Sequence, residues 1–118
     1  MTTATTERDI LHVTNHLIGK AHATAQQKGW HDEPREQGTE IALVMSELAE
    51  LLEDLREGVT DLIPEDGGKP IGPTSEIADV FIRLYDFCGK YDLPLPEMLV
   101  AKMAYNLGRE YRHGGKAF

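Results

Sequence analysis

The chain has 118 residues, 41% of them hydrophobic and 27% charged, a length that supports one hydrophobic core but not two. Its formal net charge of −8 disfavours non-specific binding to a nucleic acid polymer, because such binding needs a basic face that displaces phosphate counterions. We therefore expect a single domain over residues 1–118, with flexible ends at 1–6 and 114–118 and no nucleic acid partner.

The N-terminal segment and the cysteine content bear on the cellular location. Residues 1–6 are polar and lack the basic and apolar regions of a signal peptide, and no apolar stretch is long enough to span a membrane. The single cysteine, Cys88, has no partner for an internal disulfide. The sequence thus predicts a cytoplasmic protein with no membrane partner.

Apolar residues recur at three- and four-residue spacing in four segments, which predicts helices over residues 7–28, 39–57, 74–90 and 96–107. Gly29 and Gly58 follow the first two, as helix ends favour, and Pro73 suits the first position of the third. Residues 59–73, rich in glycine and proline, are expected to form a loop. No alternating strand pattern occurs, so the chain is predicted to be all-α, a four-helix bundle. His12 and His16 on the first helix are expected to lie on the surface.

The second predicted helix has apolar residues on more than one side. Its main apolar stripe consists of Ile41, Val44, Met45, Leu48, Leu51, Leu52 and Leu55. Leu43 falls on a different side of this helix, and Ile82 falls on the outer side of the third helix. A second apolar face would stay wet in an isolated bundle, so we expect a homodimer or homotetramer that buries it.

Two acidic pairs carry the clearest chemical signal. Glu47 and Glu50 are three residues apart on the second helix, and Glu76 and Asp79 are three apart on the third, so each pair shares one helical face. This spacing alone is also typical of solvated surface acids. If the pairs face each other, four carboxylates repel strongly, and a divalent cation with oxygen preference makes that arrangement tolerable.

The identity of the metal follows from the donor set. None of these four acids is followed by a histidine three residues later, which disfavours a di-iron bundle site, and zinc prefers histidine or cysteine ligands. Mg²⁺ fits best, with Mn²⁺ as a substitute. Because carboxylate-held Mg²⁺ usually keeps positions for water and substrate phosphates, phosphate chemistry is the favoured reaction class. Glu53 and Asp54 extend the acidic run and are expected to face solvent.

Basic and amide side chains near the C-terminus could bind a polyphosphate. Lys102, Asn106 and Arg109 share one face of the fourth helix, and basic residues continue into the tail. Such cations are also often simply solvated.

Taken together and in chain order, these motifs resemble the MazG-like all-α nucleoside triphosphate pyrophosphatases over residues 30–116. The motifs are Gly29-Trp30, Ser46-Glu47-Leu48-Ala49-Glu50, Glu76-Ile77-Ala78-Asp79-Val80, Lys102-Met103-Ala104-Tyr105-Asn106 and Arg112-His113-Gly114-Gly115-Lys116. The resemblance implies hydrolysis of a ribo- or deoxyribonucleoside triphosphate between the α and β phosphates, giving a monophosphate and pyrophosphate, in control of the nucleotide pool.

The resemblance also implies roles for individual residues. Metal binding and catalysis would fall to Glu47, Glu50, Glu76 and Asp79. One of these carboxylates would orient or deprotonate the attacking water. Phosphate or sugar would be bound by Lys102, Asn106, Arg109, Arg112 and Lys116. Trp30 would stack on the base, or alternatively close the end of the bundle as an apolar plug.

Two other classes of function remain open from the sequence. The same site could hold a nucleotide without turnover, as a binding or regulatory module. The chain could also be a helical interaction protein whose acids are solvated.

Overall fold

The computed structural model describes residues 3–109. Within them the chain forms four helices and no named strand: α1 (Thr3–Gln27), α2 (Gln37–Glu57), α3 (Pro73–Lys90) and α4 (Leu95–Leu107). The four predicted helices are confirmed, and the largest difference in bounds is the earlier start of α1. None of these helices is long and apolar enough to cross a membrane.

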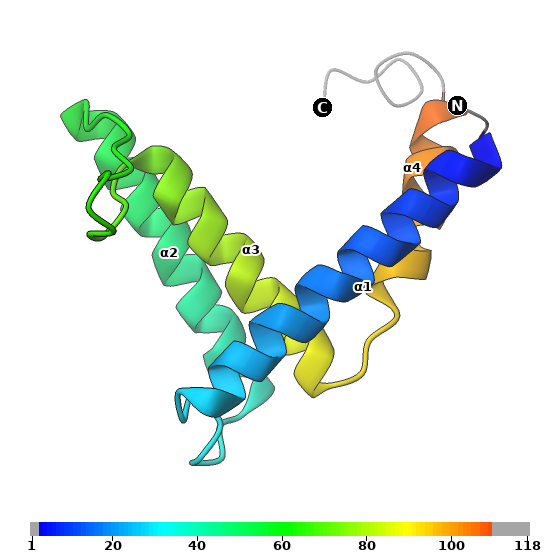
Figure 1. The fold of residues 1–118 in the computed structure, drawn as a ribbon, viewed down its shortest axis with the longest axis horizontal. Helices are drawn as coiled ribbons and strands as arrows, with labels where there is room; N and C mark the ends of the chain where they lie inside the picture. The colour runs from blue at the N-terminus through cyan, green and yellow to red at the C-terminus, as the bar shows by residue number, and fades with distance from the viewer. Residues whose placement is uncertain (1–2, 110–118) are drawn as a thin grey trace.

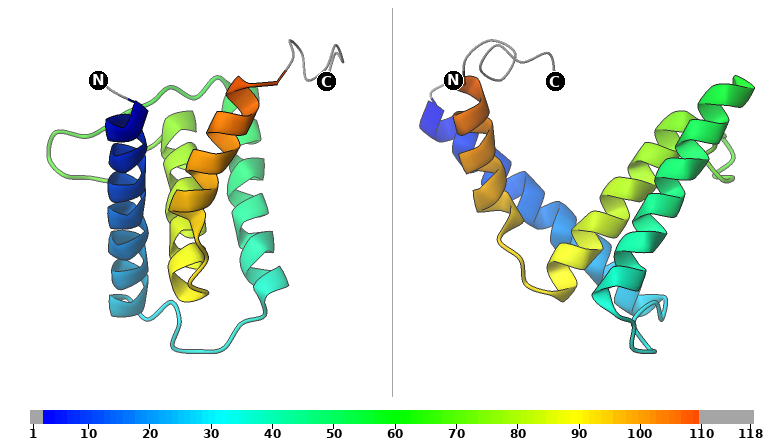
Figure 2. Two further views of the ribbon diagram at one scale, coloured as in Figure 1. Left: turned by 90° about the vertical axis from the view of Figure 1, so that its right-hand side faces the viewer. Right: turned by 180° about the vertical axis from the view of Figure 1, so that it is seen from behind.

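The helices are arranged as an open V (Figure 1). α1 and α4 form one arm, and α2 and α3 form the other. α1 packs against both α3 and α4, whereas α2 packs against α3. The view from behind in Figure 2 shows the same separation of the arms. The radius of gyration is 17.1 Å, compared with about 13.5 Å for a compact domain of this length. The all-α class is confirmed, but the predicted four-helix bundle is not, because the two arms diverge.

The core is small and includes the region where α1 crosses α3. The buried apolar residues are Ile18, Ala25, Val44 and Val80. Gly89 allows the close approach of the two helices, because a Cβ at this position would lie 2.7 Å from the Cβ of His22. The vertex of the V is therefore a closely packed contact between the arms.

The apolar stripe of α2 forms as expected, but most of it is uncovered. Val44 is buried and Leu51 half-buried. The exposed members, between 37% and 63% accessible, are Ile41, Met45, Leu48, Leu52 and Leu55. α2 turns a neighbouring face to α3, where Glu40 pairs with Lys90. The stripe is left without a partner in one chain because α1 and α4 lie in the other arm.

The connection between α2 and α3 folds back onto the start of α3. Leu62 and Ile71 exchange two backbone hydrogen bonds of 3.0 Å. The side chain of Thr74 and its backbone N–H, which donates a hydrogen bond of 2.9 Å to Asp61, both lower the pKa of Asp61. Gly72 is required here, because its φ is +110° and a Cβ would come within 2.6 Å of the Asp61 Cα. The predicted loop is confirmed, and it has a defined shape.

Candidate functional site

The two acidic motifs converge between α2 and α3. One carboxylate oxygen each from Glu47, Glu50 and Glu76 lies within 4.8 Å of the other two. Asp79 lies one turn along α3 from Glu76 and lines the same cleft. α2 and α3 pack side by side, so residues 26 or more positions apart in the sequence meet there. The sequence prediction that the pairs face each other agrees with this geometry.

Glu76 has the most perturbed carboxyl group of the cleft. Its removal from water raises its pKa to about 7, with further contributions from a hydrogen bond and charge repulsion with Glu50, and from the charges of Asp54 and Asp79. Among the described residues, its Oε2 atom is buried without a hydrogen-bond partner. Burial and the charge of Glu47 also raise the pKa of Asp79, against the opposing effects of Arg83 and Lys69.

These features fit a divalent cation. A buried carboxylate oxygen without a partner is costly, and close carboxylates repel, so a cation would relieve both. All the donors that converge here are oxygens, which suits Mg²⁺ or Mn²⁺ better than zinc. Glu47, Glu50, Glu76 and Asp79 would hold the ion.

The cleft has a volume of about 320 Å³ and is formed by α2, α3 and the loop between them. Its lining includes Lys69 and Asp54 in addition to the four predicted acids. Asp54 is half-buried, so the expectation that it faces solvent is wrong, whereas Glu53 is exposed and pairs with Arg56 at 3.2 Å. A signal for Asp54 exists in the sequence, because it lies one helical turn after Glu50 on the same face.

Lys69 was not singled out from the sequence. It is the only basic residue in the loop between the acidic motifs, which is a usable signal once the loop is known to fold over the cleft. Its ammonium group supplies positive charge to a cleft that five carboxylate side chains line. A phosphate group bound in the cleft would lie within its reach.

Trp30 lies outside the carboxylate cleft but is connected to it through Arg83. The guanidinium of Arg83 lies 5.8 Å from the centre of a Trp30 ring, and its Nε donates a hydrogen bond of 3.1 Å to Glu47. Trp30 is 40% exposed at the vertex of the V. The indole is partly covered and partly free, so base stacking and closure of the helix ends both stay predictions.

The basic residues predicted to bind phosphate are not brought to this cleft within one chain. Lys102, Asn106 and Arg109 are all exposed, at the end of the α1–α4 arm. The two cations lie 5.9 and 5.7 Å from the ring of Tyr105. Figure 1 shows this arm diverging from the α2–α3 arm that carries the acids. Arg112 and Lys116 lie outside the described residues.

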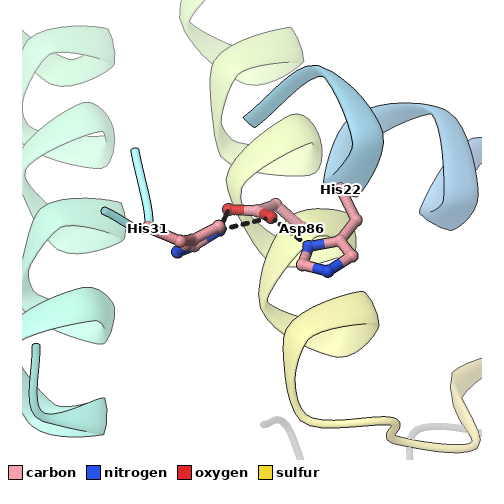
Figure 3. A group of neighbouring side chains, drawn as sticks. All are labelled: His22, His31 and Asp86. Atoms are coloured by element: carbon pink, nitrogen blue, oxygen red, sulfur yellow. Dashed lines mark hydrogen bonds and ion pairs between the residues drawn. The ribbon is translucent and has the colours of Figure 1, made fainter. Parts of the chain in front are cut away.

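Sequence reasoning also missed a cluster at the vertex. His22, His31 and Asp86 meet there from three separate segments (Figure 3). No spacing rule connects them, because each is isolated in its own part of the sequence. His12 and His16, in contrast, are exposed on α1 as expected.

Comparison of the chain with protein-family models, with curated proteins and with solved structures finds no match. The resemblance to the MazG-like enzymes therefore rests on the motifs alone.

The pKa of Glu76 leads to a measurable proton release. With a pKa of about 7, the metal-free protein should release about 0.9 proton on Mg²⁺ binding at pH 6 and about 0.1 at pH 8. Isothermal titration calorimetry in buffers of different ionisation enthalpy measures this number.

The Glu76→Gln variant is the control, and its proton release should be small at both pH values. The raised pKa of Glu76 also makes the stability of the folded, metal-free protein depend on pH. Because the folded chain keeps a proton that the unfolded chain loses above its ordinary pKa of 4.5, the metal-free protein should lose stability as the pH rises from 4.5 through 7. Equal proton release by the unmodified protein and by Glu76→Gln would contradict the assignment of the released proton to Glu76.

Proposed function

We propose that the protein is a Mg²⁺-dependent nucleoside triphosphate pyrophosphohydrolase. Water would attack the α–β phosphoanhydride, and the products would be a nucleoside monophosphate and pyrophosphate. The observation that carries the proposal is the convergence of Glu47, Glu50 and Glu76 on a cleft that Asp79 also lines. The motif resemblance names the bond that is cleaved.

The residues of the cleft have two roles in this proposal, binding of the metal and binding of the substrate phosphates. The four carboxylates hold the metal, and bound Mg²⁺ supplies Lewis-acid stabilisation of charge on the phosphate oxygens. Lys69 adds a cation from the loop. Arg83 holds Glu47 from the side of the vertex, at 3.1 Å, and so fixes the orientation of one metal-binding carboxylate.

The exposed cations of the α1–α4 arm, Lys102 on α4 and Arg109 just after it, fit the proposal through a homo-oligomer. In one chain Lys102 and Arg109 lie on the other arm of the V, so only a second copy could bring such an arm to the carboxylate cleft. The uncovered apolar stripe of α2 supplies a surface on which that copy would pack. The proposed enzyme is therefore a homodimer or a larger assembly of it.

The test is a panel of ribo- and deoxyribonucleoside triphosphates incubated with the protein, with and without Mg²⁺. Pyrophosphate should appear in a one-to-one ratio with the monophosphate, and only when the metal is present. Release of single phosphate with a diphosphate product would assign cleavage to a different bond. Nucleotide binding without any release would support the non-hydrolysing binding module instead.

A further inference from the structure

We infer that His22, His31 and Asp86 form a second metal site, specific for zinc or a similar first-row transition cation, at the vertex of the V. This site is separate from the carboxylate cleft and does not depend on nucleotide hydrolysis. Asp86 is seven residues beyond Asp79, which places it about 10 Å further along α3. Arg83, which pairs with Glu47 of the carboxylate cleft, stands between Asp79 and Asp86 on α3.

The donor atoms are already gathered for one ion. His22 Nδ1 lies 2.9 Å from Asp86 Oδ1, and His31 Nε2 lies 2.8 Å from the same oxygen. One donor atom from each residue lies within 4.8 Å of the other two. In a tetrahedral site with metal–ligand distances of about 2.0 Å, ligand atoms are roughly 3.3 Å apart. Small side-chain rotations therefore suffice to admit a cation.

The chemistry of the donors favours zinc over magnesium. Two imidazole nitrogens and one carboxylate oxygen are a known ligand set for zinc with one open position, which water can fill. Magnesium prefers an all-oxygen shell and has that shell in the carboxylate cleft. The two sites would then select different metals by ligand type.

The surroundings of the cluster exclude most of the water, and the two arginines that line the same pocket, Arg35 and Arg83, form no ion pair with Asp86. The side chains of His22, His31 and Asp86 are 23%, 19% and 9% exposed. Within residues 3–109, the only ion-pair partners of Asp86 are these two histidines. A largely buried carboxylate that pairs with two imidazoles, and with no lysine or arginine of the described residues, is an environment in which a divalent cation is favoured.

Two glycines position the histidines. Gly89 lets α1 approach α3, since a Cβ there would lie 2.7 Å from His22 Cβ, and this proximity brings His22 next to Asp86. Gly29 has a φ of +78° at the end of α1, where the chain turns. His31 follows two residues later and points back to α3 (Figure 3). Three segments of the chain would thus be connected by one ion.

The experiment uses the full chain, freed of metal by a chelator and titrated with ZnCl₂ in excess MgCl₂, which occupies the carboxylate cleft. We expect one zinc ion per chain by calorimetry. His22→Gln and His31→Gln should each lower the zinc affinity by more than the 10- to 100-fold that loss of an outer-sphere partner typically costs. Glutamine keeps an amide N–H for Asp86, so helix content by circular dichroism should be retained.

The matched control is the double variant His12→Gln with His16→Gln, which makes the same substitution twice on the exposed part of α1. Its zinc affinity should equal that of the unmodified protein. Co²⁺ added to the unmodified protein should give the strong visible absorption of a tetrahedral ion, a readout that needs no variant. Absence of zinc binding, or zinc binding lost in the control and kept in His31→Gln, would overturn the inference.

Discussion

Replacing Glu50 by Gln, or Asp79 by Asn, is expected to lower Mg²⁺-dependent pyrophosphate release by at least about 100-fold. Each change keeps the shape of the side chain but removes one negative charge and replaces one of the two carboxylate oxygens by an amide nitrogen, which cannot bind the metal. Glu50 is one of the three acids whose oxygens converge, and Asp79 lines the same cleft. The measurement is the initial rate of pyrophosphate release at saturating Mg²⁺, together with the Mg²⁺ dissociation constant.

Glu53→Gln is the matched control, because it is the same substitution one turn along α2. Glu53 faces solvent and pairs with Arg56, so its loss should leave the rate within about twofold. If Glu50→Gln and Glu53→Gln behave alike, the acids of α2 are solvated surface residues and the proposed metal site is wrong. That result would favour the helical interaction protein.

The sequence predicts the four helices and the pairing of the acids on each helix better than it predicts how the helices pack together. Helical periodicity locates the four helices, and the three-residue spacing places Glu47 with Glu50 and Glu76 with Asp79 on single faces. Both are local properties of the chain. The contact of Glu76 with the α2 acids needs only that α2 and α3, which follow one another in the chain, pack side by side.

The open arrangement could not be predicted, because periodicity does not say what covers an apolar face. Leu48 and Leu52 belong to a stripe that is typical of a core, yet each is nearly half exposed in one chain. Lys69 and the His22–His31–Asp86 cluster were missed for a related reason. The position of Lys69 depends on how the loop folds back, and that of the cluster depends on how closely two helices approach. The spacing of residues in a single sequence gives no information on either.

The uncovered stripe of α2 predicts that the protein is not a monomer. Ile41, Met45, Leu48, Leu52 and Leu55 follow one another at alternating spacings of four and three, the pattern of a helix–helix seam. The chain exposes 9130 Å², compared with about 6400 Å² for a monomeric protein of this mass. The accessible surface beyond that of a typical monomer is at most about 2700 Å². A stable interface needs only about 800 Å² from each partner, so this extra surface is large enough to supply one.

Light scattering coupled to gel filtration should therefore give a mass of at least twice 13.2 kDa. The double variant Met45→Lys with Leu52→Lys should raise the dissociation constant by at least roughly 1000-fold, since each lysine replaces a large apolar contact worth about 2 kcal/mol and both copies carry the change. The helix content should not change, because Met45 and Leu52 are 63% and 47% exposed in the single chain. The matched control is Glu57→Lys, which changes the net charge by the same amount. Because Glu57 lies on the opposite face of α2, this variant should remain an oligomer.

The double variant Met45→Lys with Leu52→Lys, once monomeric, also tests the metal-binding carboxylates separately from the cations proposed to bind phosphate. Mg²⁺ binding should persist, because Glu47, Glu50 and Glu76 converge within one chain. Pyrophosphate release should fall with dissociation, because Lys102 and Arg109 lie on the other arm of the V and only a second copy could bring them to a carboxylate cleft. A monomer that retains full activity would show that Lys69 and the acids of a single cleft suffice, and that the cations of α4 are solvated.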